Sequence, residues 1–324
     1  MTAGHLAAPP ARPFDVLALG GVCWEQAVAL TEWPPPGHRR TAMTSLHLTP
    51  GGSAPNVSVF AARAGARAAF AGKVGVDERG SELLACLSRE GVATGYCNQV
   101  PGAPTTFQIV LTVQEDWSVL LLADSALDFG PQDVPLEAIR QTRFLHLDGY
   151  GMFTDMQKAA IEEALTAARA SGTLLSVDAG TQMAMEQPEY LRGFMARADV
   201  AFANLTEARL LTGRAEDAEV IEGMSTLGPK VVVLKMGERG AWVLTPPGAT
   251  RIPAFRVRVV DTVGAGDGMV AGTLTGLCRD EPVELAARRG AAVGALVCTG
   301  AGSLGSRFGE TEIEELLATG ETYG

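Results

Sequence analysis

Residues 261–268 read Asp-Thr-Val-Gly-Ala-Gly-Asp-Gly and bring glycines, a hydroxyl and two carboxylates into one short segment. Residues 251–260 before it alternate β-branched and basic side chains, typical of an extended run, and residues 269–277 after it are small and apolar, typical of a helix. At a helix N-terminus, unpaired amides and the helix dipole favour an anion. A carboxylate beside a bound phosphate repels it, so Asp267 makes sense mainly as a proton acceptor. The segment therefore predicts phosphoryl transfer.

The same short pattern also fits an ordinary glycine cap followed by an aspartate that caps a helix. Other motifs favour the catalytic interpretation. Residues 51–65 open a second helix with paired glycines, residues 71–80 add a glycine-rich stretch, and Asn204-Leu-Thr-Glu207 and Lys235-Met-Gly237 follow. Together they resemble the ribokinase-like (PfkB) carbohydrate kinase family from about residue 14 to about residue 318, and separate motifs in the right order make the resemblance specific.

The resemblance implies an α/β protein with the ribokinase-like three-layer fold, in which a mainly parallel central sheet carries a small β-sheet lid. Strand and helix patterns that alternate along the chain also indicate βαβ units and a parallel sheet. Residues 14–324 should form one kinase domain and residues 1–13 a disordered tail. The lid strands are expected within about residues 22–48 and 105–123.

Polar or glycine residues follow the predicted strands at their carboxyl ends, where parallel sheets bind ligands. These are Gly20, Gly21, Asp148, Asp178, Asn204, Lys235 and the loop at Gly264. Because the carboxyl ends of parallel strands meet at one edge of the sheet, we expect one shared cleft.

The resemblance implies a role for several residues in the acceptor half of this cleft. Asp267 would take the proton of the acceptor hydroxyl, while the amides of the turn formed by Gly264, Ala265 and Gly266 stabilise the phosphate charge. Gly51, Gly52 and Asn56 match the family positions whose backbone and amide groups would bind the hydroxyls of the acceptor.

Two positions depart from the family pattern. Glu25 stands where the family has an aspartate that accepts hydrogen bonds from the acceptor, and the longer side chain moves that oxygen by about one methylene, which puts ribose in doubt. Cys23 stands where asparagine is common. Asp148 closes a strand and is either a further acceptor contact or an ordinary turn residue.

Three residues of the nucleotide half, Asn204, Glu207 and Lys235, each have two interpretations. Asn204 and Glu207 match a motif that binds Mg²⁺ and phosphates mainly through water, with Glu207 as a solvated carboxylate, and they also fit a helix cap with a capping-box glutamate. Lys235 would reach the phosphates or lie along a sheet edge. Gly237 would line the nucleotide site.

A monovalent cation is a further implication of the resemblance. Asp261 and the carbonyl of Val263 match positions that ligate such a cation beside the anion site, with more oxygens from residues 299–303, and these donors suit K⁺. Asp261 could equally cap its own turn through Thr262. Both interpretations remain open.

Composition excludes several other classes of protein. The net charge of −11 and pI near 4.9 argue against a nucleic-acid or anionic-membrane surface, and no apolar run approaches a membrane span. The five cysteines lack the spacing of a zinc or redox site, which indicates reduced thiols and a cytoplasmic protein. Pro229 stands where a Walker loop needs lysine, and no dinucleotide motif appears at Gly20.

We therefore expect an ATP-dependent kinase that requires Mg²⁺ and phosphorylates a primary hydroxyl of a sugar or sugar-like molecule under a closing lid. A nucleoside kinase of the same family and a non-catalytic sugar-binding sensor are the alternatives. The exposed edges of the lid strands predict a homodimer through the lid.

A neutral sugar is favoured over a nucleoside because Glu25 and Asn56 are hydrogen-bonding groups suited to hydroxyls. Phe107 and Trp117 on the lid could stack on a base, but their alternation fits strand packing equally well. A sugar acid would need a cationic partner such as Arg39 or Arg40.

Overall fold

The computed structural model describes residue 6 and residues 10–34, 36–37, 40–113, 116–122, 124, 127–151, 153–246 and 248–322. Arg39 and the side chain of Trp117, both considered above as acceptor contacts, lie outside the described residues. Residues 1–5 and 7–9 of the expected tail lie outside them as well, so their disorder stays a prediction. Arg12 is anchored, because its guanidinium donates hydrogen bonds to the carbonyls of Thr142 and Ser171.

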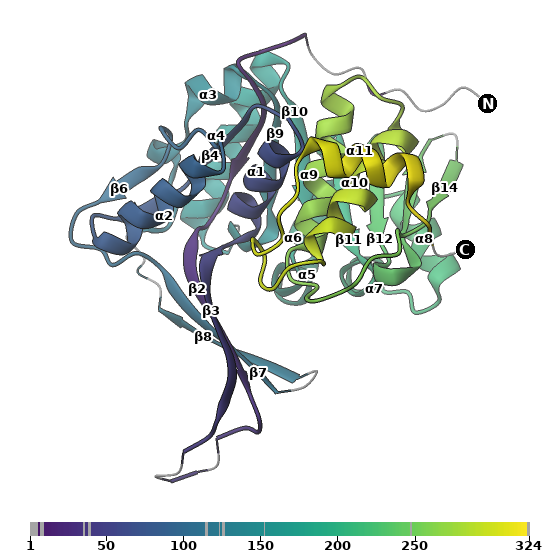
Figure 1. Cartoon of the computed structure of the whole chain (residues 1–324). Helices are drawn as coiled ribbons and strands as arrows, with labels where there is room; N and C mark the ends of the chain where they lie inside the picture. The colour runs from purple at the N-terminus through teal and green to yellow at the C-terminus, as the bar shows by residue number, and fades with distance from the viewer. Residues whose placement is uncertain are drawn as a thin grey trace.

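The main sheet has eight strands in the order β14-β13-β12-β11-β10-β9-β1-β4 (Figure 1). Their bounds are β1 Phe14–Leu19, β4 Ala68–Ala71, β9 Thr142–Asp148, β10 Leu174–Asp178, β11 Val200–Asn204, β12 Val231–Lys235, β13 Ala241–Thr245 and β14 Gly248–Ile252. Six adjacent strands of this sheet pair in parallel, namely β4, β1, β9, β10, β11 and β12. At one edge, β13 and β14 pair antiparallel.

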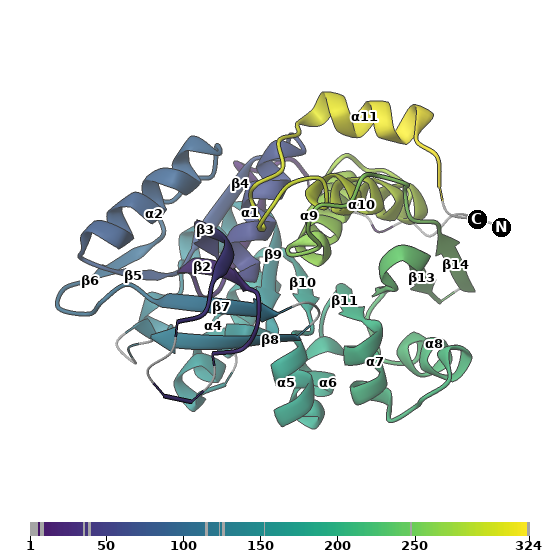
Figure 2. The same ribbon diagram turned by 60° about the horizontal axis from the view of Figure 1, so that its bottom comes forward.

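Helices cover both faces of this sheet (Figure 2). One layer holds α1 Ser53–Arg63, α2 Glu78–Arg89, α9 Ala265–Cys278, α10 Val283–Val297 and α11 Glu310–Thr319. The other holds α3 Leu136–Arg140, α4 Asp155–Ser171, α5 Thr181–Glu186, α6 Pro188–Met195, α7 Leu205–Thr212 and α8 Asp217–Ser225. In β1, Val16 and Ala18 pack into the first layer while Leu17 and Leu19 pack into the second, because successive side chains of a strand point to opposite faces.

A second sheet of four strands projects away from this body (Figure 1). Its order is β3-β2-β7-β8, with β2 Cys23–Leu30, β3 Met43–Gly51, β7 Phe107–Val113 and β8 Asp116–Leu122. β5 Lys73–Gly75 and β6 Asn98–Val100 form a short parallel pair beside it. The predicted α/β class with a mainly parallel main sheet and a small separate sheet is thus confirmed.

One predicted element is wrong. Residues 251–260 were expected to be extended up to the glycine motif, but β14 ends at Ile252. Proline has no amide to donate to a sheet ladder, so Pro253 ends the strand, and Phe255 makes only an isolated bridge with Thr322. The glycine motif is therefore approached by irregular chain, in which Val259 and Val260 are exposed.

All five cysteines are free thiols. No helix within the described residues is both long and apolar enough to span a membrane. The cytoplasmic location stays a prediction.

Candidate active site

The strands β9 to β12 end with polar residues at one edge of the sheet, because the strands are parallel. A cavity of about 160 Å³ lies at this edge. It is lined by Ser53, Asp148, Tyr150, Asp178, Gly180, Thr181, Asn204, Glu207, Lys235 and Asp267. The structure thus brings together residues that the sequence analysis assigned to the base, the acceptor and the nucleotide.

Asp267 lies in the first turn of α9, directly after the glycine turn. Gly264 is the N-cap with φ of 82°, a left-handed conformation that favours glycine. The Oδ1 atom of Asp267 accepts a hydrogen bond from the Ser53 hydroxyl at 2.7 Å, and Oδ2 accepts one from Nδ2 of Asn56 at 2.8 Å. The N-cap of α9 is Gly264 and Asp267 is the third residue of the helix, so the interpretation of Asp267 as the N-cap is wrong.

The protonation of Asp267 reflects opposing contributions. Burial raises the pKa of the carboxyl to about 6, and the negative charge of Asp178 adds to this rise. The hydrogen bonds from Ser53 and Asn56 and the charge of Lys235 lower the pKa and oppose the rise. The result is a carboxyl that ionises close to neutral pH, as a general base requires.

The amides of the glycine turn differ in what they already bind. The amide of Ala265 donates to the carbonyl of Thr262 at 3.2 Å, and the amide of Gly268 donates to Gly264. Among the described residues, no acceptor is bonded to the amides of Gly266 and Asp267. A Cβ on Gly266 would lie 3.3 Å from Nζ of Lys235, so this turn and the lysine face each other closely.

The start of α1 approaches Asp267 because of the paired glycines. Gly52 has φ of 111°, and a Cβ there would lie 2.6 Å from the carbonyl oxygen of Gly21. A Cβ on Gly51 would lie 3.0 Å from Cβ of Glu25. Asn56 is buried, and its Oδ1 atom has no hydrogen-bond partner among the described residues.

Asp148 joins β9 to α1. Its Oδ2 atom accepts from the amide of Ala54 at 3.0 Å, and its Oδ1 atom accepts from the amide of Tyr150 at 2.9 Å. Burial raises the pKa of Asp148 to about 7. The turn interpretation from the sequence is therefore right for the contact with Tyr150, and the contact with Ala54 adds a cap for a helix that has no side-chain cap of its own.

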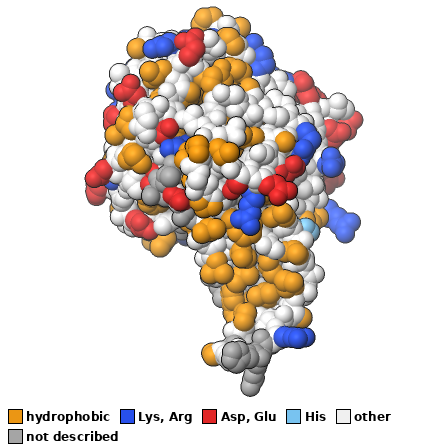
Figure 3. All heavy atoms as spheres, turned by 90° about the vertical axis from the view of Figure 1, so that its left-hand side faces the viewer, with side chains coloured by type: hydrophobic (Ala, Val, Ile, Leu, Met, Phe, Trp, Pro, Cys, Tyr) orange, Lys and Arg blue, Asp and Glu red, His pale blue; other side chains and the backbone are white. Residues whose placement is uncertain are grey.

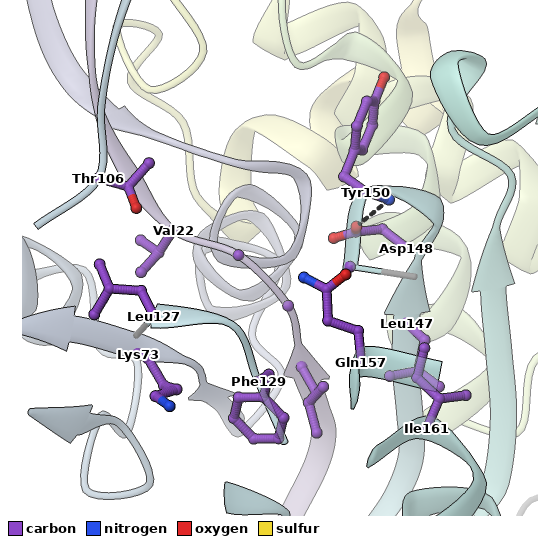
Figure 4. A pocket seen from close by; sticks show the side chains of 14 residues that line it. Val22, Lys73, Thr106, Leu127, Phe129, Leu147, Asp148, Tyr150, Gln157 and Ile161 are labelled. Carbon is purple, nitrogen blue, oxygen red and sulfur yellow. Dashed lines mark hydrogen bonds between the residues drawn. The ribbon is translucent and has the colours of Figure 1, made fainter. Parts of the chain in front are cut away.

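A second cavity of about 70 Å³ shares Asp148 and Tyr150 with the first (Figure 4). Leu147, Ile161 and Phe129 give it an apolar floor, and Lys73 and Gln157 reach it from opposite sides. Lys73 is paired with Asp133 at 3.1 Å, so its charge is already neutralised.

Glu25 lies outside the lining of both cavities. It stands on β2, where Nε2 of Gln108 on the neighbouring strand β7 donates to its Oε2 atom. Burial raises the pKa of Glu25, and the charge of Asp261 adds to the rise. Glu25, which was predicted to contact the phosphate acceptor, thus lies on the projecting sheet near its junction with the main body.

Lys235 ends β12 and points into the first cavity. Its Nζ atom donates to both carboxylate oxygens of Asp178 at 2.7 Å, and only 12% of the lysine side chain and 10% of the aspartate side chain are exposed. The alternative of a lysine along a sheet edge is therefore wrong. The sequence placed Asp178 at a strand end but gave it no partner.

Asn204 and Glu207 form the capping box that the sequence allowed. The amide of Asn204 donates to Glu207 at 2.7 Å, and the amide of Glu207 donates to Asn204 at 2.9 Å. Thr181 also donates to Glu207. Glu207 is only 4% exposed, so the expectation of a solvated carboxylate is wrong, and burial raises its pKa.

The proposed cation ligands have backbone partners. Asp261 accepts from the amide of Val263 at 3.0 Å and from the amide of Gly302 at 2.8 Å. The carboxylate therefore caps its turn through Val263 and not through Thr262, and it holds the loop of residues 299–303. In that loop the buried hydroxyl of Ser303 has no hydrogen-bond partner among the described residues. Gly237 lies in the exposed turn after β12 with φ of 60°.

Several residues of the first cavity had no role in the sequence analysis. Ser53 lies inside the glycine motif, between Gly52 and Asn56, and Asp178 lies at a predicted strand end. Tyr150, Gly180 and Thr181 follow strand ends by two or three positions and carried no signal of their own.

The layered fold and a glycine turn beside a carboxyl of raised pKa define a ribokinase-like phosphotransferase. A solved structure of adenosine kinase from Sinorhizobium meliloti has a similar fold, with a TM-score of 0.83. The two sequences are 21% identical, and the match covers 95% of this chain and 100% of that one. The family model described as pfkB family carbohydrate kinase matches residues 15–307. The chain belongs to this family of ATP-dependent carbohydrate kinases.

Two curated relatives show the range of the similarity. Fructokinase-2 of Solanum habrochaites is 29% identical over 244 residues, which cover 72% of this chain and 74% of the relative. A 5-dehydro-2-deoxygluconokinase of Shouchella clausii is 26% identical over 305 residues, which cover 88% of this chain and 90% of the relative. The resemblance seen in the sequence is thereby confirmed, and the enzyme is a kinase rather than a non-catalytic sensor.

Proposed function

We propose that this kinase transfers the γ-phosphate of ATP to a primary hydroxyl of a neutral sugar or sugar-like molecule. The observation that carries the proposal is the position of Asp267, a carboxyl of raised pKa at the start of α9, beside Lys235 and the first turn of α1. A group that ionises near neutral pH is suited to accept a proton late in phosphoryl transfer.

In this proposal Asp267 takes the proton of the acceptor hydroxyl as the hydroxyl oxygen bonds to the γ-phosphorus and ADP leaves. The phosphate charge develops near the helix N-terminus, where preorganised amides stabilise it without reorganisation. Of the turn residues Gly264, Ala265 and Gly266, the amide of Ala265 already donates to Thr262, so the amides of Gly266 and Asp267 are the better donors.

The nucleotide would bind along Asn204, Glu207, Lys235 and Gly237. Lys235 fits the phosphates because its cation faces the glycine turn across the missing side chain of Gly266. Among the described residues, no three acidic, histidine or cysteine side chains converge to hold a metal ion. Mg²⁺ fits such a site when phosphate oxygens and water complete its shell, with Glu207 acting through water. When bound, the ion neutralises phosphate charge.

A K⁺ ion would lie at Asp261 and the carbonyl of Val263. The unpartnered hydroxyl of Ser303 supports this assignment, because a buried oxygen without a hydrogen bond can serve as a ligand. The cation would stabilise the loop of residues 299–303, which lies so close to the glycine turn that a Cβ on Gly264 would be 3.2 Å from Cβ of Ser303.

A sugar acceptor is supported by the polar groups at the start of α1. Asn56 has a buried Oδ1 atom without a partner, which a donor hydroxyl of the acceptor would satisfy. The carboxylate oxygens of Glu25 and Asp148 could accept further hydrogen bonds from the sugar hydroxyls. Gly51 and Gly52 have no side chains and would let the sugar approach the backbone closely. The relatives named for fructose and 5-dehydro-2-deoxygluconate support a sugar over a nucleoside, whereas the likeness to adenosine kinase rests on the fold.

A screen of purified enzyme tests this proposal. ADP production is measured with ATP, Mg²⁺ and a panel of hexoses, pentoses, sugar acids and nucleosides, and Asp267→Asn serves as the matched control for contaminating ATPase. We expect turnover with a neutral sugar. Efficient turnover with nucleosides and none with sugars would replace the sugar by a nucleoside, and no turnover on any acceptor would overturn the proposal.

The projecting sheet would close over the acceptor and pair with a second copy of the chain. Its surface carries exposed hydrophobic side chains (Figure 3), among them Met43, Leu46, Leu48, Leu120 and Leu122. β3 and β8 are edge strands, and edges with exposed apolar side chains favour pairing between chains. Sedimentation of the wild type and of Leu48→Glu tests this, since a monomeric wild type would overturn the dimer.

A further inference from the structure

Ser53 contacts the proposed base directly. It is the first residue of α1, and its hydroxyl lies 2.7 Å from Oδ1 of Asp267, across 214 positions of the chain. Asn56, one helical turn later, holds Oδ2 of the same carboxylate at 2.8 Å. Residues three apart on a helix share one face, so the first turn of α1 donates hydrogen bonds to both carboxylate oxygens of Asp267.

The turn that carries Ser53 is itself fixed in place. The amide of Ala54 donates to Asp148 at the end of β9. Gly52 packs so closely against the carbonyl of Gly21 that a side chain would not fit. The Ser53 hydroxyl is therefore held against Asp267 by contacts to the main sheet, before any acceptor arrives.

We propose that Ser53 is a positioning residue whose hydroxyl orients the Asp267 carboxylate and keeps it ionised for the acceptor's proton. The inference rests on the proposed function, since it requires Asp267 to be the base. With Asn56 alone, one bonded oxygen would leave the carboxylate plane free to turn. The second bond from Ser53 fixes that plane and leaves lone pairs on both oxygens for the acceptor hydroxyl.

Other titratable groups also face Asp267, and the charged ones among them contribute to its protonation. They are Asp148 from β9, Tyr150 from the following turn, Asp178 from β10 and Lys235 from β12. Their contributions remain in a Ser53 variant, so a change in the titration of Asp267 reports the loss of the hydroxyl itself. A hydrogen bond to the charged form lowers the pKa of a carboxyl, so its loss must raise it.

The experiment compares Ser53→Ala, Ser53→Thr and Ser58→Ala by pH–rate profiles on the best acceptor. Ser53→Ala should move the acid limb of kcat upward by about one pH unit and lower kcat at neutral pH by about tenfold, with little change in the KM for ATP. Ser53→Thr keeps the hydroxyl and should restore the wild-type limb.

Ser58→Ala is the matched control. The Ser58 hydroxyl belongs to the same helix and donates to the carbonyl of Ala54 at 3.0 Å, without contact to Asp267. Its profile should match the wild type. An unmoved limb in Ser53→Ala, or an equal shift in Ser58→Ala, would overturn the role of Ser53.

The two proposals fail in different ways. If Asp267→Asn turns over normally, the base and the proposed function are both wrong. If Asp267→Asn is inactive while Ser53→Ala keeps the wild-type limb and kcat, only the role of Ser53 is wrong.

Discussion

Asp267→Asn removes the charge of the proposed base and nearly preserves its shape. The amide oxygen of the new side chain can accept from Nδ2 of Asn56, and its NH₂ group can donate to the Ser53 hydroxyl, which both donates and accepts. The two contacts of the wild type can therefore persist. Any loss of activity then reports the missing proton acceptor rather than a disturbed site.

The turnover of Asp267→Asn should fall by roughly 10²–10⁴, the usual contribution of a general base. The KM of the acceptor should change little, because the contacts proposed between its hydroxyls and Asn56 and Glu25 do not involve the substituted side chain. The assay is ADP release on the best acceptor from the screen. Turnover close to that of the wild type would refute the assignment of Asp267 as base.

The same variant should be more stable than the wild type at alkaline pH. The folded pKa of Asp267 is raised from 3.8 to about 6, so its favourable contribution is complete below pH 3.8 and is lost as the pH rises through 6. Full ionisation would then cost about 3 kcal/mol, and because the residue as a whole is only half-buried, solvent screening reduces this to about 1–2 kcal/mol. Asparagine never ionises and escapes that cost.

Thermal unfolding measures this difference directly. The melting temperature of Asp267→Asn should exceed that of the wild type by about 2–4 °C near pH 8 and should match it near pH 4. A variant that melts below the wild type near pH 8 would show that the ionised carboxylate stabilises the fold, which contradicts the argument from burial.

Other variants test the remaining assignments. Glu25→Ala should raise the KM of the acceptor by about tenfold or more while the KM for ATP stays near the wild-type value, and equal changes in both would remove Glu25 from the acceptor site. Glu207→Gln should raise the Mg²⁺ concentration for half-maximal rate severalfold, with an unchanged titration leaving Glu207 as a cap alone. Replacing K⁺ by tetramethylammonium at constant ionic strength should depress turnover if a cation binds at Asp261, and equal rates would exclude it.

The fold was predictable wherever local signals agreed with tertiary packing. Strands β1 and β12 are marked in the sequence by short apolar runs, residues 16–19 and 231–234, which are buried on both faces of the sheet. Helix α4 begins after the Thr154 capping box and ends at Gly172 in a left-handed conformation, so both ends are marked in the sequence. The prediction that residues 251–260 are extended failed because their alternation of side chains suits a strand, whereas Pro253 lacks the amide that would continue the strand beyond Ile252.

The positions of the site residues were predictable for a topological reason. Parallel strands place their carboxyl ends at one edge, so Asp148, Asn204 and Lys235 had to lie near one another once the strands were recognised. The burial of Glu207 was not predictable in this way. A glutamate in a capping box is exposed on most helices, and here the start of α7 faces a cavity that forms only when α5 and β12 are in place.

The pairing among the charges depends on distances that no local pattern contains. Lys235 could balance Asp178, Glu207 or Asp267, and only the folded chain gives both of its short hydrogen bonds to Asp178. Because Lys235 pairs with Asp178, Asp267 has no hydrogen bond from a cation among the described residues, and its carboxylate is stabilised by neutral donors on α1 instead. A carboxylate paired directly with lysine would have a low pKa and would be a weak base, whereas burial raises the pKa of Asp267 to about 6 even though its two neutral hydrogen-bond donors lower it. The ion pair beside the base is therefore part of what makes Asp267 suited to accept a proton.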